Sequence, residues 1–237
     1  MPTESKIPAI TTQQMVEVDR LMVEDYGIGL IQMMENAGRS LAELTRRRLG
    51  GDVSGRNIAV LCGAGNNGGG GMVAARHVHN WGAEVAVKAV FKPEKMKDIP
   101  AHQWDILQKI GIPDLKTEQV SHAEIILDAI IGYGLSGDPY GLAAEWIEIA
   151  NRSRIPILAL DAPSGLYTTT GIPGDPCISA TATLTLALPK TGLLEPAARP
   201  VVGDLYLADI SVPAELYRQI GILIPPIFSQ DHIIRIT

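Results

Sequence analysis

Strands alternating with helices predict an α/β protein whose central sheet is mostly parallel and covered on both faces. From residue 57 onward, short apolar runs alternate with stretches of helical period, and helical connections of that kind join parallel strands. The apolar run 57–62 also leads into a glycine-rich stretch, 62–71, and then into a helical stretch. That order of strand, turn and helix start is typical of folds that bind phosphate groups.

The composition is that of one ordinary globular domain. The chain has 237 residues, of which 46% are hydrophobic and 19% charged, and it has no repeat or linker, so we expect one domain over 1–237. A formal net charge of -6 and 5% aromatic residues argue against nucleic acid as a partner. The sequence contains no run of about 18 apolar residues, so we expect no membrane span. It also shows no apolar signal core, so we expect no secretion signal. Two cysteines, Cys62 and Cys177, are too few for a disulfide framework or a zinc site, which fits a cytoplasmic location.

A helical segment over about 8–50 is expected before the α/β core. Thr11 and Gln14 have the spacing of a capping box. The apolar residues that follow them recur at helical spacing. Gly27 and Gly29 predict the end of this first helix. A second helix is predicted over 30–49 because two glycines follow it.

Within the core, about 55–212, each element follows from an apolar run or a helical period. Strands are predicted at 57–62, 84–91, 125–128, 157–160, 182–188 and 204–209, and helices at 70–81, 101–110 and 142–151. The final strands have no long helix between them, so an antiparallel turn is allowed there. A tail over 213–237 follows, with a short helix expected at 214–220.

The glycine-rich stretch 62–71 is expected to be a turn that cradles phosphates. Glycine lets the backbone approach an anion closely, and the dipole of the following helix favours negative charge. The residues 63–68 match the pattern G-x-G-x-x-G, which is a weak signal by itself. A dinucleotide dehydrogenase also needs an acid at the end of the second strand, and none occurs before Glu94. A dehydrogenase is therefore disfavoured, and a plain glycine-rich turn is the other interpretation.

Two further loops begin with an acid at the end of a predicted strand. Asp128 opens one loop and Asp161 the other, with Ser164 close behind. Because the carboxyl ends of parallel strands meet at one edge of a sheet, these residues and Asn67 are expected to converge on one crevice. The alternative is that each aspartate only caps a turn or a helix.

Lys190 follows the predicted strand 182–188 and is a further candidate. Its ammonium group suits a phosphate or a developing anion. The alternative is an ordinary solvated lysine at a strand end. The histidines show no metal-binding spacing, since His77 and His79 point in different directions on a helix.

Five short motifs occur in one order along the chain. They are MENAG at 34–38, GNNGG at 65–69, DAIIG at 128–132, LDAPSGL at 160–166 and LPKTG at 188–192. Together they resemble the NAD(P)H-hydrate epimerases, the YjeF N-terminal domain family, over about residues 10–212. The resemblance implies a Rossmann-like three-layer α/β/α sandwich. It also implies an isomerase that interconverts the R and S forms of hydrated NADH and NADPH (NAD(P)HX) at C6 of the damaged nicotinamide ring.

The same resemblance implies a cofactor, partners and residue roles. Family members bind one potassium ion, are often homodimers, and act with a dehydratase that repairs the S form. Asn67, Asp128 and Ser164 would ligate the K⁺, and all three offer oxygen. Asp161 would act as general acid and base, with Lys190 as a second catalytic candidate. The residues that would line the substrate are Asn66, Asn67, Gly68, Gly69, Gly70, Gly132, Tyr133, Gly134, Leu135, Ser136, Gly137, Asp138 and Asp161.

Gly70 departs from the family pattern, which usually reads Gly-Asn-Asn-Gly-Gly-Asp-Gly. The departure removes a carboxylate from the helix start. That change either eases phosphate binding or removes an orienting hydrogen bond, and the sequence leaves both open. It also motivates an alternative function, a non-catalytic nucleotide-binding or scaffold module of the same fold. Retention of Asp128, Asp161 and Ser164 favours the enzyme.

Overall fold

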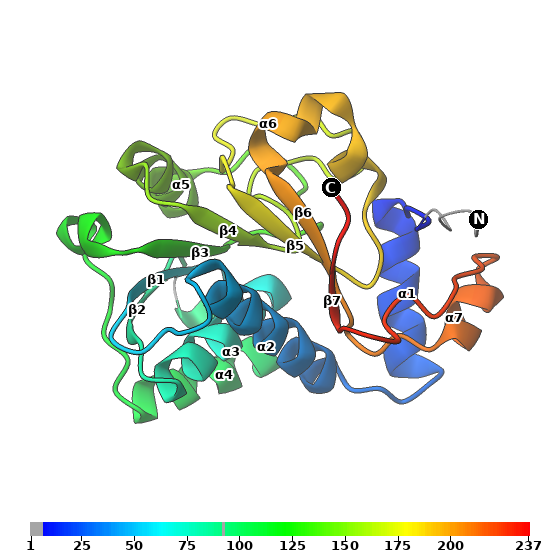
Figure 1. The fold of residues 1–237 in the computed structure, drawn as a ribbon, viewed down its shortest axis with the longest axis horizontal. Coiled ribbons are helices and arrows are strands. Elements are labelled where there is room, and N and C mark those ends of the chain that lie inside the picture. The colour runs from blue at the N-terminus through cyan, green and yellow to red at the C-terminus, as the bar shows by residue number, and fades with distance from the viewer. Residues whose placement is uncertain (1–6, 92) are drawn as a thin grey trace.

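A seven-stranded sheet forms the centre of the part of the chain that the computed structural model describes, residues 7–91 and 93–237 (Figure 1). Residues 1–6, where no signal core is expected, lie outside the described part. The strands stand in the order β2-β1-β3-β4-β5-β6-β7. Their bounds are β1 Asn57–Cys62, β2 Glu84–Ala89, β3 Ile125–Ala129, β4 Ile157–Leu160, β5 Ala182–Leu186, β6 Asp204–Ala208 and β7 Ile233–Arg235. The strands from β2 to β6 in this order pair in parallel with one another.

Helices cover both faces of the sheet, which gives the three layers that were predicted (Figure 1). On one face lie α2 (Leu30–Arg48), α3 (Asn66–Asn80) and α4 (Asp98–Lys109), and on the other α5 (Gly141–Ser153) and the short α6 (Arg199–Val202). Side chains of β1 alternate between these layers: Val60 belongs to the core beneath α3, and Leu61 to the core beneath α5. This period of two is what a strand buried on both faces requires.

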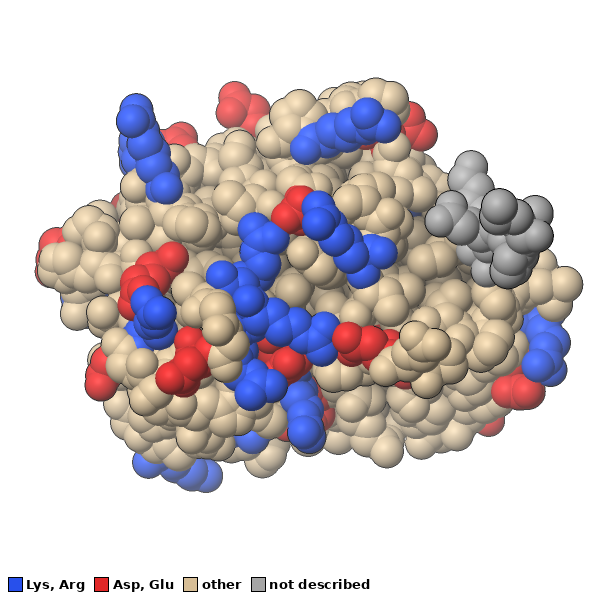
Figure 2. Space-filling model, viewed as in Figure 1, with Lys and Arg blue, Asp and Glu red and all other residues tan. Residues whose placement is uncertain are grey.

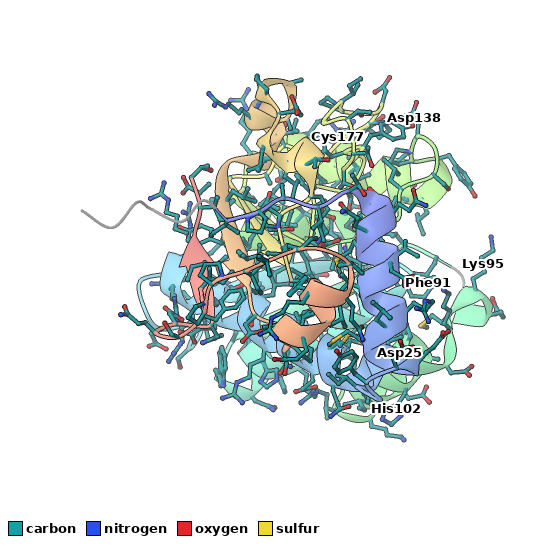
Figure 3. All side chains as sticks on the ribbon, turned by 90° about the vertical axis from the view of Figure 1, so that its right-hand side faces the viewer. Asp25, Phe91, Lys95, His102, Asp138 and Cys177 are labelled. Atoms are coloured by element: carbon teal, nitrogen blue, oxygen red, sulfur yellow. The ribbon has the colours of Figure 1, made fainter. Side chains whose placement is uncertain are left out.

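Two helices stand apart from the layers. Figure 3 shows α1 (Thr12–Glu24) upright in front of the sheet, with α7 (Ala214–Gln219) beside it. The predicted capping box starts α1: the Thr11 hydroxyl accepts from the Gln14 backbone N–H at 3.1 Å, and the Gln14 side chain accepts from the Thr11 N–H at 2.9 Å. None of the helices in the described part is long and apolar enough to cross a bilayer.

The glycine-rich stretch differs from the prediction, because α3 begins at Asn66 and not near residue 70. A side chain at Gly68 would place a Cβ 1.8 Å from the Gly63 carbonyl oxygen, and one at Gly69 would lie 2.5 Å from the Met34 sulfur. Glycines cost about 1 kcal/mol each inside a helix. Close packing on α2 and on the sheet offsets that cost, so most of the expected turn is helix.

The end of the sheet also differs from the prediction. β5 and β6 are parallel, because the chain between them crosses over through 3-10 turns and α6, without a long helix. β7 pairs antiparallel with β6, and it comes from the tail, which the sequence leaves outside the core. A strand of three residues is too short to show alternation.

Ion pairs connect the tail to α2. On the face shown in Figure 2, basic side chains over the end of α2 and over β7 alternate with acidic ones. Arg47 pairs with Asp231 at 2.8 Å, and Arg48 and Arg235 both pair with Asp204, at 2.6 and 2.8 Å. Exposed pairs of this kind each contribute roughly 0–1 kcal/mol, so they orient the tail more than they stabilise it.

Candidate functional site

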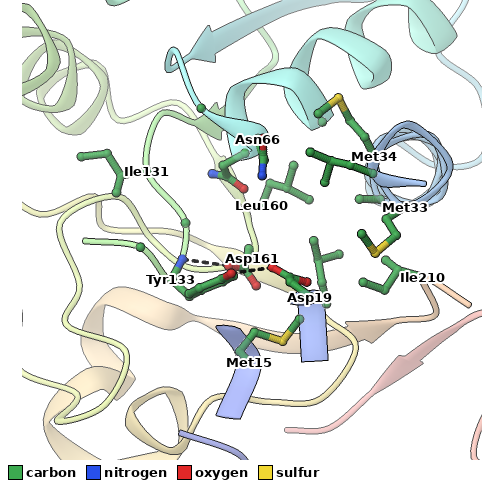
Figure 4. A pocket seen from close by; sticks show the side chains of 18 of the residues that line it. Met15, Asp19, Met33, Met34, Asn66, Ile131, Tyr133, Leu160, Asp161 and Ile210 are labelled. Atoms are coloured by element: carbon green, nitrogen blue, oxygen red, sulfur yellow. Dashed lines mark hydrogen bonds between the residues drawn. The ribbon is translucent and has the colours of Figure 1, made fainter. Parts of the chain in front are cut away.

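A pocket of about 500 Å³ opens at the carboxyl ends of the parallel strands (Figure 4). This is the edge at which ligands bind in open α/β sheets. Its walls come from the β1–α3 and β3–α5 loops, the end of β4, and the helices α1 and α2. The lining residues are Met15, Asp19, Leu30, Met33, Met34, Ala37, Ala64, Gly65, Asn66, Asn67, Gly70, Lys97, Ile130, Ile131, Gly132, Tyr133, Gly134, Leu160, Asp161, Leu186, Lys190 and Ile210.

The start of α3 forms one wall. Gly65 caps the helix, and Gly65, Asn66 and Asn67 all line the pocket. The first N–H groups of a helix have no acceptor within it, and the helix dipole makes this end partly positive. The wall therefore suits an anionic group, as the glycine-rich stretch predicts, although the amides belong to a helix and not to a free turn.

A buried ion pair forms the opposite side. Lys190 is 0% exposed and Asp161 4%, and the Lys190 Nζ donates to Asp161 Oδ1 and, at 3.0 Å, to the Leu186 carbonyl. The Tyr133 backbone N–H donates to Asp161 Oδ2 at 2.8 Å. The interpretation of Lys190 as a solvated lysine is therefore wrong. Asp161 has a φ of 66°, which aspartate tolerates better than most residues.

Asp128 and Ser164 meet beneath the pocket. Asp128 is 0% exposed and accepts from the Ser164 N–H at 2.8 Å and the Ser164 hydroxyl at 2.6 Å. It also accepts from the Ile130 N–H at 3.2 Å, two residues on, so part of its role is the turn-capping one. Burial raises the pKa of Asp128 to about 6 even though these hydrogen bonds favour the carboxylate. No cationic side chain in the described part of the chain pairs with it.

Asn67 lies beside Gly132, and its buried Nδ2 has no hydrogen-bond partner among the described residues. A Cβ at Gly132 would lie 3.2 Å from the Asn67 Oδ1 and 2.8 Å from the Asp161 Oδ2. The missing Cβ at Gly132 therefore leaves room for both of these side chains beside it. The N and O atoms of an amide are assigned from hydrogen bonds, and exchanging them makes the unpartnered atom an oxygen.

The structure brings together only part of the predicted substrate-lining set. Asn66, Asn67, Gly70, Gly132, Tyr133, Gly134 and Asp161 line the pocket, with Lys190. Gly68 and Gly69 are buried inside α3, and Leu135, Ser136, Gly137 and Asp138 lie beyond the walls. Asp138 is exposed, as Figure 3 shows, and accepts from the Tyr167 hydroxyl at 3.0 Å.

Several residues that line the pocket were not predicted from the sequence. Met15 and Asp19 come from α1, and Lys97 stands exposed at the start of α4. The Asp19 Oδ2 accepts from the Tyr133 hydroxyl at 2.5 Å, and burial raises the pKa of Asp19. The sequence does contain an indication for Asp19. It is four residues from Met15 and three from Met22, so it is an acidic residue on the apolar face of α1.

Comparison with known proteins agrees with this architecture. The sequence profile of the family described as YjeF-related protein N-terminus matches residues 30–192. The NAD(P)H-hydrate epimerase of Dehalogenimonas lykanthroporepellens is 39% identical, over 91% of this chain and 87% of that protein. The bifunctional NAD(P)H-hydrate repair enzyme Nnr of Moorella thermoacetica is 40% identical over 87% of this chain, which spans only 41% of that enzyme.

The fold has a solved counterpart. The crystal structure of yeast ynu0 superposes with a TM-score of 0.83 over 97% of this chain and all of that one, at 24% identity. The profile match covers most of the α/β core, and it includes the pocket residues from Leu30 to Lys190. The chain belongs to the YjeF-related N-terminal domain family.

Proposed function

We propose that this protein is an isomerase that interconverts the R and S forms of hydrated NADH and NADPH at C6 of the nicotinamide ring. The observation that carries the proposal is the buried Asp161–Lys190 pair, which lies in a pocket whose other wall is the start of α3. A proton-transfer group and an anion-binding helix start then serve the nicotinamide ring and the phosphates of one dinucleotide. The similar proteins named NAD(P)H-hydrate epimerase support the same activity.

The chemistry is a removal and return of water at one carbon. C6 carries a hydroxyl next to the ring nitrogen N1, so protonation of that hydroxyl lets the C6–O bond break while the N1 lone pair forms a C6=N1 bond. Water then adds to the other face and loses a proton. Asp161 is the proposed group that exchanges these protons, and Lys190 holds its carboxylate in place. Lys190 stays the second catalytic candidate.

The substrate phosphates are proposed to lie at the start of α3, against Asn66 and Asn67. Lys97 lines the mouth of the pocket and is exposed, so its charge is available to a phosphate. Extension of the dinucleotide over 135–138 stays a prediction, as does any role for Gly68 and Gly69 in binding it. Of the residues described, only the Leu160 side chain would meet a Cβ at Gly70, at 2.8 Å, so the position faces the pocket without a carboxylate.

Potassium is proposed as the cofactor, held by Asn67, Asp128 and Ser164. These residues fit such an ion, because Asp128 is a buried carboxylate without a basic partner in the described part of the chain, and because Asn67 has an unpartnered amide. All three lie against the segment 130–132: Asp128 and Ser164 through hydrogen bonds, Asn67 beside Gly132. A bound K⁺ would supply positive charge that neutralises Asp128 and fixes this wall of the pocket.

The proposed partners follow from the relatives. A dehydratase is expected to consume the S form, since the Moorella relative is named a bifunctional repair enzyme and this chain matches part of it. A homodimer and a cytoplasmic location, without a nucleic-acid or membrane partner, are proposed from the family resemblance and the composition. A non-catalytic scaffold of the same fold is the second candidate, and the buried acid–base pair favours the enzyme over it.

The test is an assay coupled to an S-specific dehydratase, started from pure R-hydrate in potassium buffer and followed by the return of NADH absorbance. Asp161→Asn is expected to lose about 10²–10⁴-fold in kcat. The matched control is Asp105→Asn, an exposed carboxylate on α4 outside the pocket, which keeps full activity. A wild-type rate no higher than the spontaneous one overturns the function; full activity in Asp161→Asn overturns only the role of Asp161.

A further inference from the structure

Asp19 places a second carboxyl group in the same pocket. It lies on α1, on the face that also carries Met15, and both residues line the cavity. Its Oδ2 accepts a hydrogen bond from the Tyr133 hydroxyl at 2.5 Å, whereas its Oδ1 accepts no hydrogen bond from the described residues. One oxygen is therefore held in position, and the other is available to a ligand.

Tyr133 connects the two carboxyl groups. Its backbone N–H donates to Asp161 at 2.8 Å, and its hydroxyl donates to Asp19. Its ring centre lies 5.6 Å from the Lys190 ammonium. In Figure 4 Asp19 and Asp161 approach the pocket from different elements, α1 and the end of β4, and Tyr133 is hydrogen-bonded to both. Two carboxyl groups from different elements therefore line the same pocket.

The two carboxyl groups have different surroundings. Asp161 is paired with an ammonium group. Asp19 has no ammonium group among the described residues in hydrogen-bond contact, and burial raises its pKa while the Tyr133 hydrogen bond opposes that rise. The titratable and charged groups that face Asp19 are Tyr133, Lys190, Asp161 and, from α7, Tyr217. Environments that separate two carboxyl groups in this way allow one to act as the acid and the other as the base.

We propose that Asp19 is a second catalytic acid–base residue, which serves the face of the nicotinamide ring opposite to the one that Asp161 serves. The proposal rests on the epimerase function. In one direction Asp19 gives a proton to the leaving hydroxyl as the C6–O bond breaks and N1 forms the double bond to C6. A water molecule then adds from the other face, and its proton passes to Asp161. The substrate loses one water and gains one, and the reverse direction exchanges the two roles.

Each carboxyl group recovers its starting proton state through the water of the open pocket. The structural alternative is that the Asp19–Tyr133 hydrogen bond only fastens α1 to the loop 130–134. The two interpretations differ in pH dependence. Because Asp19 acts as an acid in its protonated form, kcat falls as the pH rises through its pKa. The Tyr133 hydroxyl stabilises the carboxylate, so its removal raises the pKa of Asp19 further and shifts that fall to higher pH.

The experiment measures kcat and KM against pH in the coupled assay for wild type, Asp19→Asn and Tyr133→Phe. Asp19→Asn is expected to lose about 10²–10⁴-fold in kcat, while its KM stays within about threefold of the wild-type value. The decrease of kcat at high pH should be absent from this variant. In Tyr133→Phe the decrease of kcat should remain but occur at a higher pH. The control is Glu17→Gln on the same helix. Within the described part of the chain this carboxylate pairs only with Arg20, on the surface, and the change should leave both kcat and KM unaltered.

Three results overturn the role of Asp19. They are a kcat for Asp19→Asn within threefold of wild type, a high-pH fall that persists in that variant, and an unshifted fall in Tyr133→Phe. If Asp19→Asn does not fold, as judged by circular dichroism, the shift in Tyr133→Phe decides the matter by itself. An inactive wild-type protein overturns the epimerase function instead, so the two failures are distinguishable.

Discussion

Breaking the Asp161–Lys190 pair tests whether the site depends on a buried ion pair. Lys190→Met removes the ammonium and keeps a straight apolar side chain of similar length. Lys190 is 0% exposed and Asp161 4%, so solvent does not compensate the charge that remains. Asp161→Asn is the complementary change, and asparagine tolerates the φ of 66° at this position. Neither substitution therefore adds backbone strain to the electrostatic effect.

The magnitude follows from the contacts that survive. Removing one member of a buried pair costs about 3–5 kcal/mol. In Lys190→Met the Asp161 carboxylate keeps the Tyr133 N–H, and in Asp161→Asn the ammonium keeps the Leu186 carbonyl, so we expect about 3 kcal/mol for each. The double variant leaves no unpaired charge and should cost about 2–3 kcal/mol less than the sum of the two. Each single change then lowers the Tm by about 6–12 °C.

Urea unfolding followed by circular dichroism measures the free energy of unfolding of the four proteins. Lys109→Met, an exposed change at the end of α4, is the control and should stay within about 0.5 kcal/mol of wild type. The reasoning would be refuted if each single variant lost less than about 1 kcal/mol in its free energy of unfolding. Strictly additive losses in the double variant would also show that the two side chains do not interact.

Three further predictions concern the ion, the packing of α3 and the pocket mouth. At pH 7.5, K⁺ should raise the Tm of the wild-type protein relative to choline at equal ionic strength, and it should leave the Tm of Asp128→Asn unchanged. Equal Tm values of the wild-type protein in both salts would contradict the proposed K⁺ site. The K⁺ effect should shrink by pH 5, because burial raises the pKa of Asp128 to about 6. Without the ion, the contribution of Asp128 to stability is present at low pH and is lost as the pH rises through that value, and bound K⁺ offsets this loss. Gly68→Ala places a Cβ 1.8 Å from a carbonyl oxygen and should cost at least about 1–3 kcal/mol in urea unfolding, whereas Gly134→Ala, with open space around it, should change stability by less than about 0.5 kcal/mol. Lys97→Ala should raise KM by about 3–10-fold through loss of a charge-assisted contact, while Lys95→Ala in the same segment leaves KM unchanged; equal KM values for wild type and Lys97→Ala would remove the lysine from the site.

The sequence by itself determined the features that depend on neighbours along the chain. Alternation and apolar runs located the strands from β1 to β6, and the Thr11–Gln14 spacing located the start of α1. The rule that parallel strands end at one edge predicted that Asn67 and Asp161 approach each other, and both side chains lie close to Gly132. These signals are readable because period, capping and turn chemistry act within a few residues.

Only the tertiary structure decided the features that depend on distant partners. Residues 66–71 resemble a flexible turn when considered alone, and they are helical because Met34 and the sheet pack closely against them. Lys190 is buried because Asp161, far along the chain, neutralises it, and Asp19 enters the pocket because the Tyr133 hydroxyl binds it across more than a hundred residues. Burial and charge pairing are properties of the folded chain as a whole, so local sequence patterns do not reveal them.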